Sequence, residues 1–266
     1  MAYLDPNRWR VAVLVLSFTG AAAAAVAQSE GAAALRAFQE WKQLPANAAL
    51  AFGDALKRYR ERLTSLGATV SAADRTIRLI VAHHEGELYN RIYAGSPDFN
   101  TKPNAVLVAA VEGVSPGSAL DVGMGQGRNA LYLASRGWQV TGFDVAEVGL
   151  ERAREQAAKV GVKVTAVHAA DDEFEFGRAR WDLIAIIYAL EKRSVHHVRD
   201  ALKPGGLVVI EAGHTQISGA PFGYGTNELL ETFKGFRILR YEDTSGSYDW
   251  GPESIRLVRL VAQKPQ

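Results

Sequence analysis

Hydrophobic residues recur at three- and four-residue spacing over the first third of the chain. The recurring positions are Leu35, Phe38, Trp41, Phe52, Leu56, Tyr59, Leu63, Leu66, Ile77, Ile80, His84, Leu88 and Ile92. Side chains at this spacing fall on one face of an α-helix, and charged residues fill many of the positions between them. The pattern predicts an extension of about three helices over residues 28–95, interrupted near Pro45 and Gly67.

The hydrophobic period changes after Asn104. Short apolar runs predict strands at 118–123, 139–145, 162–169, 181–190 and 205–212, and the segments at 105–114, 128–137, 146–161 and 194–204 predict helices. Strands that alternate with helices form a parallel sheet covered on both faces. Two further strands, at 236–243 and 254–263, have no helix between them and should pair antiparallel at one edge. We therefore expect an α/β fold in which residues 96–266 form a doubly wound, mostly parallel, seven-stranded sheet, preceded by the helical extension.

Residues 1–27 differ in composition from the rest of the chain. Arg8 and Arg10 precede a nearly uncharged run that ends with the sequence AVA at residues 25–27, which is the pattern of a secretory signal peptide. We interpret this segment as a signal peptide or a membrane anchor, and expect the rest of the chain to be periplasmic in a bacterium or held at a membrane. An uncleaved anchor with its domain facing the cytoplasm stays open, because an apolar run of about 17 residues is near the lower limit for a span. A buried cytosolic helix is the third alternative.

Composition narrows the classes of partner. The chain has 266 residues, of which 30 are Lys or Arg and 29 are Asp or Glu, so no overall charge favours nucleic acid. It contains no cysteine, which excludes disulfides, thiolate metal sites and cysteine nucleophiles. The histidine pairs at 83–84 and 196–197 lack the spacing of common zinc motifs. We expect a small-molecule substrate, no nucleic-acid partner and no metal, while the oligomeric state stays open.

A glycine-rich loop follows the first predicted strand and precedes a predicted helix. It contains Gly123, Gly125 and Gly127, at the point where a doubly wound sheet opens a crevice beside a positive helix terminus. The dinucleotide fingerprint requires a glycine where this chain has Arg128, which argues against an NAD-dependent oxidoreductase. Asp121, at the entrance of the loop, would repel a diphosphate and attract an ammonium group. The loop predicts a cationic ligand without phosphate groups.

With these residues in this order, the chain resembles the class I S-adenosylmethionine-dependent methyltransferases over residues 98–263. The stretch LDVGMGQGRNALYLA is similar to their first motif, with Asp121, Gly123, Gly125 and Gly127 in its acidic and glycine positions. The longer stretch GQGRNALYLASRGWQVTGFD is most similar to the tellurite-resistance and thiopurine-type small-molecule enzymes. The resemblance implies a Rossmann-like methyltransferase fold, S-adenosylmethionine as cofactor, and a glycine loop that approaches its methionine part.

Two further motifs extend the resemblance. Asp144 in VTGFDV matches the acidic residue that accepts hydrogen bonds from both ribose hydroxyls in this family, and Asp171 in HAADDEFEF matches the position that binds the adenine amino group. The neighbouring Asp172, Asn129 and Val145 complete the cofactor site that the resemblance implies. Taken alone, Asp144 could cap the next helix and Asp171 could lie in a solvated turn, so the order of the motifs carries the assignment.

Catalysis by such a site depends mainly on placement. The sulfonium methyl group is already activated, so a nucleophile held in line and shielded from water needs no dedicated base. Where a base is used, the candidates at the ends of the fourth and fifth strands are Tyr188, Glu191, Glu211 and His214, and we favour Tyr188 and His214. A neutral imidazole at His214 could take a proton near neutral pH.

Aromatic residues indicate where a substrate could bind. Tyr89 and Tyr93 lie one helical turn apart just before the cofactor domain, and Phe99, Phe222 and Tyr224 add further aromatic surface. These side chains could cover an apolar or aromatic substrate, or they could belong to the core.

The sequence therefore predicts methyl transfer to the O, N, S or metalloid atom of a small molecule. A protein or peptide methyltransferase and a non-catalytic exported binding module on the same fold are the alternatives. One conflict stays open at this point, because S-adenosylmethionine is made in the cytosol whereas residues 1–27 resemble an export signal.

Overall fold

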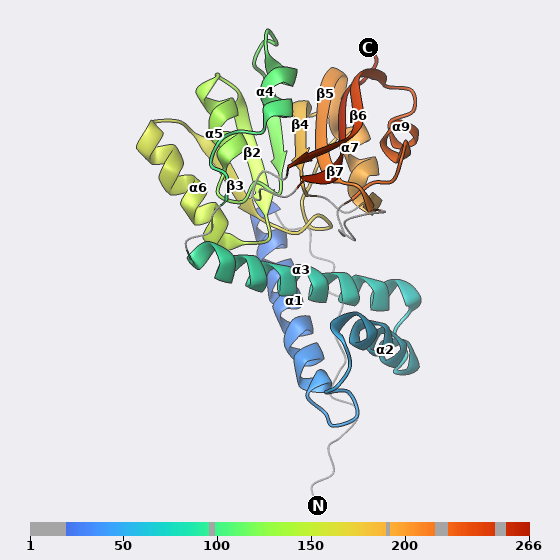
Figure 1. Ribbon diagram of the computed structural model, residues 1–266. Helices are drawn as coiled ribbons and strands as arrows, with labels where there is room; N and C mark the ends of the chain where they lie inside the picture. The colour runs from blue at the N-terminus through green and yellow to red at the C-terminus, as the bar shows by residue number, and fades with distance from the viewer. Residues whose placement is uncertain (1–19, 96–98, 190–191, 216–222, 248–253) are drawn as a thin grey trace, which may run out of the picture.

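The computed structural model describes residues 20–95, 99–189, 192–215, 223–247 and 254–266 (Figure 1). Most of the predicted signal segment, together with the candidates Glu191 and Phe222, lies outside these residues. Helix α1 (Gly20–Lys42) runs without a break through residue 27, the predicted cleavage position. Within the described part of the chain, no helix is long and apolar enough to cross a membrane.

A seven-stranded sheet forms the centre of the fold. Its strands are β1 (Ser118–Val122), β2 (Gln139–Asp144), β3 (Val164–His168), β4 (Trp181–Ile187), β5 (Leu202–Gly213), β6 (Arg237–Ser247) and β7 (Ser254–Gln263). The spatial order is β3-β2-β1-β4-β5-β7-β6. Strands β1 to β5 are parallel, and β7 is antiparallel to both of its neighbours. The predicted mostly parallel, doubly wound sheet and its antiparallel edge are confirmed.

Two hydrophobic cores cover the two faces of the sheet. The helices that flank it are α4 (Ala105–Val111), α5 (Arg128–Ser135), α6 (Glu147–Val160), α7 (Val195–Ala201) and α9 (Glu228–Thr232). Along β4, Ile184 and Ile186 belong to the core that contains residues of α7 and α9, whereas Leu183 and Ala185 belong to the core that contains residues of α4, α5 and α6. This alternation follows from the two-residue period of a strand buried on both faces.

The helical extension packs beneath the sheet (Figure 1). It consists of α1, α2 (Phe52–Ser65) and α3 (Val70–Ala94), and has its own core around Phe38, Trp41, Tyr59 and Ile80. Leu66, which the spacing placed in the apolar stripe, is 68% exposed because it lies at the end of α2. Helix α3 contacts α6 and lies across the sheet, so one wall of the region below the strands comes from the extension.

Candidate cofactor and substrate site

A cavity of about 510 Å³ lies between α3 and the carboxyl ends of the parallel strands. This volume is within the range of pockets that enclose ligands of drug size. The sequence-predicted residues that line it are Tyr89, Tyr93, Phe99, Gly123, Gly125, Asn129, Asp144, Val145, Asp171, Asp172 and Tyr188. Residues from the extension and from the ends of four strands therefore meet at one place.

The glycine loop adopts backbone conformations that other residues rarely take. Gly123 and Gly125 have φ angles of 65° and 50°. A Cβ atom at Gly123 would lie 2.4 Å from the Cβ of Ala189, and one at Gly125 would lie 2.2 Å from the hydroxyl oxygen of Tyr93. Glycine is needed at both positions because the side chains of Ala189, just after β4, and of Tyr93 on α3 approach the loop so closely.

Gly127 has a different task from the other two glycines. It caps α5 with a φ angle of 84°, and a Cβ atom there would lie 2.9 Å from the Cβ of Ala153 on α6. The residue is not part of the cavity lining. It thus allows close helix packing behind the loop rather than an approach to a ligand.

Asp144 ends β2 and faces the cavity. Its two carboxylate oxygens accept hydrogen bonds of 2.8 Å from the backbone N–H groups of Gly125 and Ala146. Burial raises the pKa of this carboxyl, and the two N–H groups act in the opposite direction. The bond to Ala146 is the local turn that the helix-capping alternative required, while the bond to Gly125 ties the side chain to the glycine loop. A carboxylate oxygen has two lone pairs, so both oxygens can still accept from a ligand.

Asp171 and Asp172 follow β3 and border the cavity. Asp172 forms an ion pair with Arg78 of α3, and each of the two side chains is about one-third exposed. This contact joins the helical extension to the loop after β3. Asp172 therefore has a structural partner in addition to the role that the resemblance implies for it.

Asp121 occupies a different environment from the one the sequence suggested. Its side chain is 2% exposed and does not line the cavity. Burial raises its pKa to about 7, against the opposing effects of Arg128 and of a hydrogen bond from the backbone N–H of Ala130. Among the described residues, its Oδ2 atom has no hydrogen-bond partner. A carboxyl that is only partly ionised near neutral pH attracts a cation weakly, so the electrostatic argument made for Asp121 does not hold in the folded protein.

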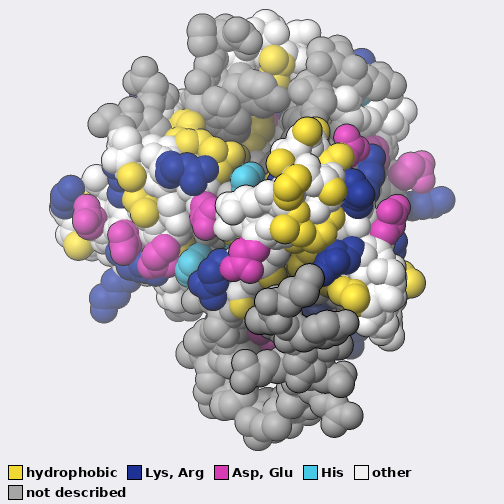
Figure 2. Space-filling view, turned by 90° about the horizontal axis from the view of Figure 1, so that it is seen from below, with side chains coloured by type: hydrophobic (Ala, Val, Ile, Leu, Met, Phe, Trp, Pro, Cys, Tyr) yellow, Lys and Arg dark blue, Asp and Glu magenta, His cyan; other side chains and the backbone are white. Residues whose placement is uncertain are grey.

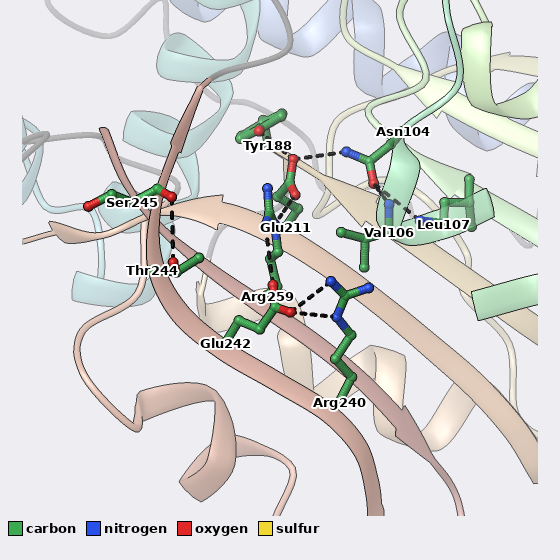
Figure 3. Close-up of polar contacts among 10 residues, drawn as sticks. All are labelled: Asn104, Val106, Leu107, Tyr188, Glu211, Arg240, Glu242, Thr244, Ser245 and Arg259. Carbon is green, nitrogen blue, oxygen red and sulfur yellow. Dashed lines mark hydrogen bonds and ion pairs between the residues drawn. The ribbon is translucent and has the colours of Figure 1, made fainter. Parts of the chain in front are cut away.

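Tyr188 joins the cavity to a buried polar network (Figure 3). Its hydroxyl donates to Oε1 of Glu211, which also accepts a hydrogen bond of 2.8 Å from Nδ2 of Asn104. Oε2 of Glu211 accepts from Nε of Arg259 at 2.5 Å. The guanidinium of Arg259 in turn contacts Glu242 at 3.2 Å. Glu211 is thus a buried carboxylate whose oxygens are held by donors from three parts of the chain.

His214 and Tyr224 lie away from the cavity. His214 is fully buried, with Nε2 at 3.1 Å from the hydroxyl of Thr226 and 3.8 Å from Asp243. Tyr224 pairs with His214 through an isolated β-bridge and is buried under Lys192. The structure does not bring these two residues to the predicted site: β5 pairs with β7 up to Gly213, and the backbone N–H of His214 donates to the carbonyl oxygen of Arg256 at 2.9 Å. Within the described residues there is no cluster of side chains that could hold a metal ion.

Several cavity residues were missed from the sequence. They include Arg75, Arg78, Leu79, Ala82 and Glu85 of α3, and Arg128 of α5. On α3, positions 78, 82, 85, 89 and 92 follow helical three-and-four spacing, and this signal could have been extended from the two tyrosines. Arg259, which does not line the cavity but pairs with Glu211 behind it, also gave a signal, as one of two arginines in a largely apolar strand.

Comparison with known proteins gives this arrangement a family. Residues 119–206 match the sequence model of a methyltransferase domain. The chain is 33% identical over 182 residues to a ubiquinone biosynthesis O-methyltransferase of Idiomarina loihiensis, covering 58% of this chain and 74% of that protein. The chain belongs to the S-adenosylmethionine-dependent methyltransferases.

Further comparisons agree on the fold. The probable S-adenosyl-L-methionine-dependent methyltransferase TehB of Haemophilus influenzae is 26% identical over 165 residues, covering 58% of each chain. The crystal structure of TehB superposes with a TM-score of 0.55 at 22% identity, over 60% of this chain and 62% of that one. The [4+2]-cyclase SpnF gives 0.56 at 20% identity, over 69% and 96%. The chain spans about three-fifths of the length of the first curated relatives it matches.

The cofactor of the family is S-adenosylmethionine, and the cavity fits it. Gly123 and Gly125 line the cavity and have no side chain, so a ligand can approach the backbone there. Asp144 presents a carboxylate fixed by two N–H groups at the next strand end. A Rossmann-like site needs these two features at the switch point of the sheet, where the strand order reverses on either side of β1.

Proposed function

We propose that this protein transfers a methyl group from S-adenosylmethionine to a small-molecule nucleophile bound in the same cavity. The observation that carries the proposal is the position of α3, which supplies one wall of the cavity opposite the glycine loop. A wall at this place would bring a small acceptor bound in the same cavity next to the residues assigned to the cofactor. The relative from Idiomarina loihiensis, which its name describes as an O-methyltransferase acting in ubiquinone biosynthesis, supports a small-molecule acceptor.

We assign the cofactor contacts as the resemblance implies. Gly123 and Gly125 would bind the methionine part, Asp144 the ribose hydroxyls, and Asp171 the adenine amino group. Asn129, Val145 and Asp172 line the same space. The bound cofactor supplies an activated methyl group, and the protein supplies orientation and the exclusion of water.

The walls of the cavity suit an apolar or aromatic acceptor. Tyr89 and Tyr93 of α3 lie with their ring centroids 6.4 Å apart, and the ring of Phe99 meets that of Tyr93 edge-on at 5.6 Å. These three rings would cover a flat acceptor and keep water from the reacting atoms.

Protein and nucleic-acid substrates fit this arrangement less well. A protein substrate needs an open groove, whereas α3 crosses this side of the sheet. On the face shown in Figure 2, basic and acidic side chains of the described residues are interspersed, so that this face has no continuous basic surface. One curated relative is a ribosomal RNA methyltransferase, but the match covers 37% of its length.

The test is calorimetric titration of the full chain with S-adenosylmethionine and with its demethylated product. We expect micromolar binding that Asp144→Ala abolishes. Asp182→Ala is the matched control, because Asp182 contacts Ser118 and Lys203 and does not line the cavity. Methyl transfer to thiols and aromatic hydroxyls is then measured. A folded protein that binds neither ligand would refute the proposal and favour the non-catalytic binding module.

We also propose that residues 1–27 direct export or anchor the protein at a membrane. The arginines before the apolar run and the AVA sequence at its end support this proposal. An anchor with the domain facing the cytoplasm would give the protein access to cytosolic S-adenosylmethionine. Protease treatment of bacterial spheroplasts is the test: protection of the domain supports the inward orientation, and its digestion from outside excludes it.

A further inference from the structure

Tyr188 is held in an unusual backbone conformation at the end of β4. Its φ angle is 56°, in the left-handed region that residues other than glycine rarely adopt. The backbone N–H donates to the carbonyl oxygen of Glu211 at 2.8 Å, and the side-chain hydroxyl donates to the carboxylate of the same residue. One residue of β5 therefore fixes both the backbone and the side chain of Tyr188, and these two contacts offset the strain of the left-handed conformation.

The carboxylate of Glu211 is in turn fixed by its surroundings. The residue is 2% exposed, and both of its oxygens are occupied by donors: Tyr188 and Asn104 on Oε1, and Arg259 on Oε2. Asn104 is itself fixed, because its Oδ1 caps α4 and its backbone N–H donates to Asn129 at 2.9 Å. The guanidinium of Arg259 supplies the charge that a buried carboxylate requires.

This network determines the hydrogen-bonding role of Tyr188. An ionised carboxylate can only accept, and a phenol has a single proton, so the proton of Tyr188 is committed to Glu211. Toward a ligand in the cavity, the phenolic oxygen can therefore act only as an acceptor. A ligand atom that meets Tyr188 must carry a hydrogen.

We propose that Tyr188 selects and orients a methyl acceptor that bears an O–H or N–H group, and that Glu211 is the positioning residue that keeps the tyrosine an acceptor. The inference rests on the proposed function and narrows its substrate class from O, N, S or metalloid nucleophiles to hydroxyls and amines. When the O–H or N–H group of the substrate donates a hydrogen bond to Tyr188, a lone pair on the same oxygen or nitrogen stays free to point at the methyl group. Tyr188 orients this group without taking its proton, because both oxygens of Glu211 already accept hydrogen bonds, and the proton leaves to solvent after the methyl transfer.

The test uses the full chain saturated with the demethylated cofactor and carrying tyrosine labelled with carbon-13 at Cζ. The signal of Tyr188 is the one missing in Tyr188→Phe. The probes are two matched pairs, phenol with anisole and aniline with N,N-dimethylaniline, in which only the first member can donate a hydrogen bond. We expect phenol and aniline to shift this signal and to bind about 2- to 12-fold more tightly than their partners, as one net hydrogen bond implies.

Two variants separate positioning from a purely structural role. In Tyr188→Phe the preference for donors should disappear while the demethylated cofactor still binds. In Glu211→Leu the acceptor of the phenolic proton is removed, which frees this proton for the cavity, and binding of the demethylated cofactor checks that the variant is folded. This variant should bind anisole more tightly than the wild type does, a gain that simple loss of packing would not produce.

The outcomes are distinct from those of the proposed function. Equal binding within each pair, a preference that survives in Tyr188→Phe, or no shift by any donor while the demethylated cofactor binds would each overturn the inference. Failure of the demethylated cofactor itself to bind the folded wild-type protein would instead overturn the proposed function.

Discussion

Replacing Asp121 by Asn should change how the stability of the protein depends on pH. In the unfolded chain, the pKa of an aspartate is about 3.9. In the folded protein, burial raises this pKa to about 7. The stability that the raised pKa contributes is fully present below the unfolded value and is lost as the pH rises through the folded value. From these two values, the site removes about 2.6 kcal/mol from the free energy of unfolding between pH 5 and pH 8.

The assay is urea denaturation of the wild type and of Asp121→Asn at pH 5, 6, 7 and 8, followed by circular dichroism. The asparagine keeps an acceptor for the N–H of Ala130, and any cost of its unpaired NH₂ group is the same at every pH and cancels. The loss of stability between pH 5 and pH 8 should be larger in the wild type by about 2–3 kcal/mol.

The control for this experiment is Asp74→Asn. Hydrogen bonding to Arg60 lowers the pKa of Asp74, so this carboxylate is ionised across the whole range and its replacement should leave the difference between pH 5 and pH 8 unchanged. Equal pH dependence in the wild type and in Asp121→Asn would refute the argument that burial holds a proton on Asp121.

Three further predictions concern the loop, the extension and the contact between them. Gly125→Ala should weaken cofactor binding in calorimetry by at least about tenfold. Gly161 also has a positive φ, but a Cβ atom there would have no neighbour within 4 Å, so Gly161→Ala should lower the free energy of unfolding in urea by only about 1 kcal/mol. Phe38→Ala should cost about 3–5 kcal/mol in the unfolding of the extension followed by circular dichroism, because its ring is 1% exposed in the aromatic core. Arg78→Ala should reduce cofactor affinity by no more than about fivefold, and the effect should shrink in high salt, because the pair with Asp172 is one-third exposed.

The fold could be predicted from the sequence because the hydrophobic spacing of the helices differs clearly from the short apolar runs of the strands. Runs such as 183–187 are apolar at every position, which is typical of strands buried on both faces, and β4 contributes residues to both cores. The missing helix before the last run, 254–263, correctly predicted the antiparallel edge. The hydrophobic spacing wrongly predicted that Leu66 is buried. The spacing continues past the end of α2, but Leu66 is exposed there.

The site was harder to predict because it depends on directions that a linear motif does not contain. The motifs correctly brought the glycine loop and Asp144 to one cavity. They could not show that Asp121, only two residues before the loop, is buried in the protein, or that His214 is buried away from the cavity. They also gave no reason to connect Glu211 with Arg259. These two residues are direct partners in the register of β5 and β7, and this register is not visible in a motif.

Asp121 and Asp144 lie on neighbouring strands, but their carboxyl groups have different surroundings. Both are carboxylates on adjacent parallel strands, and burial raises the pKa of each. Asp144 accepts two backbone N–H bonds and faces the cavity, whereas Asp121 accepts one and is enclosed. Two N–H groups stabilise a negative charge at the place where a ligand can use it. The glycine loop is thus tied to Asp144 through the N–H of Gly125, whereas Asp121 is tied to α5 through the N–H of Ala130.

The part of the chain that defines the family is separate from the part that would choose the acceptor. The matched domain covers residues 119–206, yet the wall opposite the glycine loop is α3, and the ion partner of Glu211 is Arg259. Solved structures with this fold include both TehB and a [4+2]-cyclase, so the fold alone leaves the reaction open. Acceptor specificity must therefore be sought in the tyrosines of α3 and in the network behind Tyr188, where this chain contributes residues from outside the shared domain.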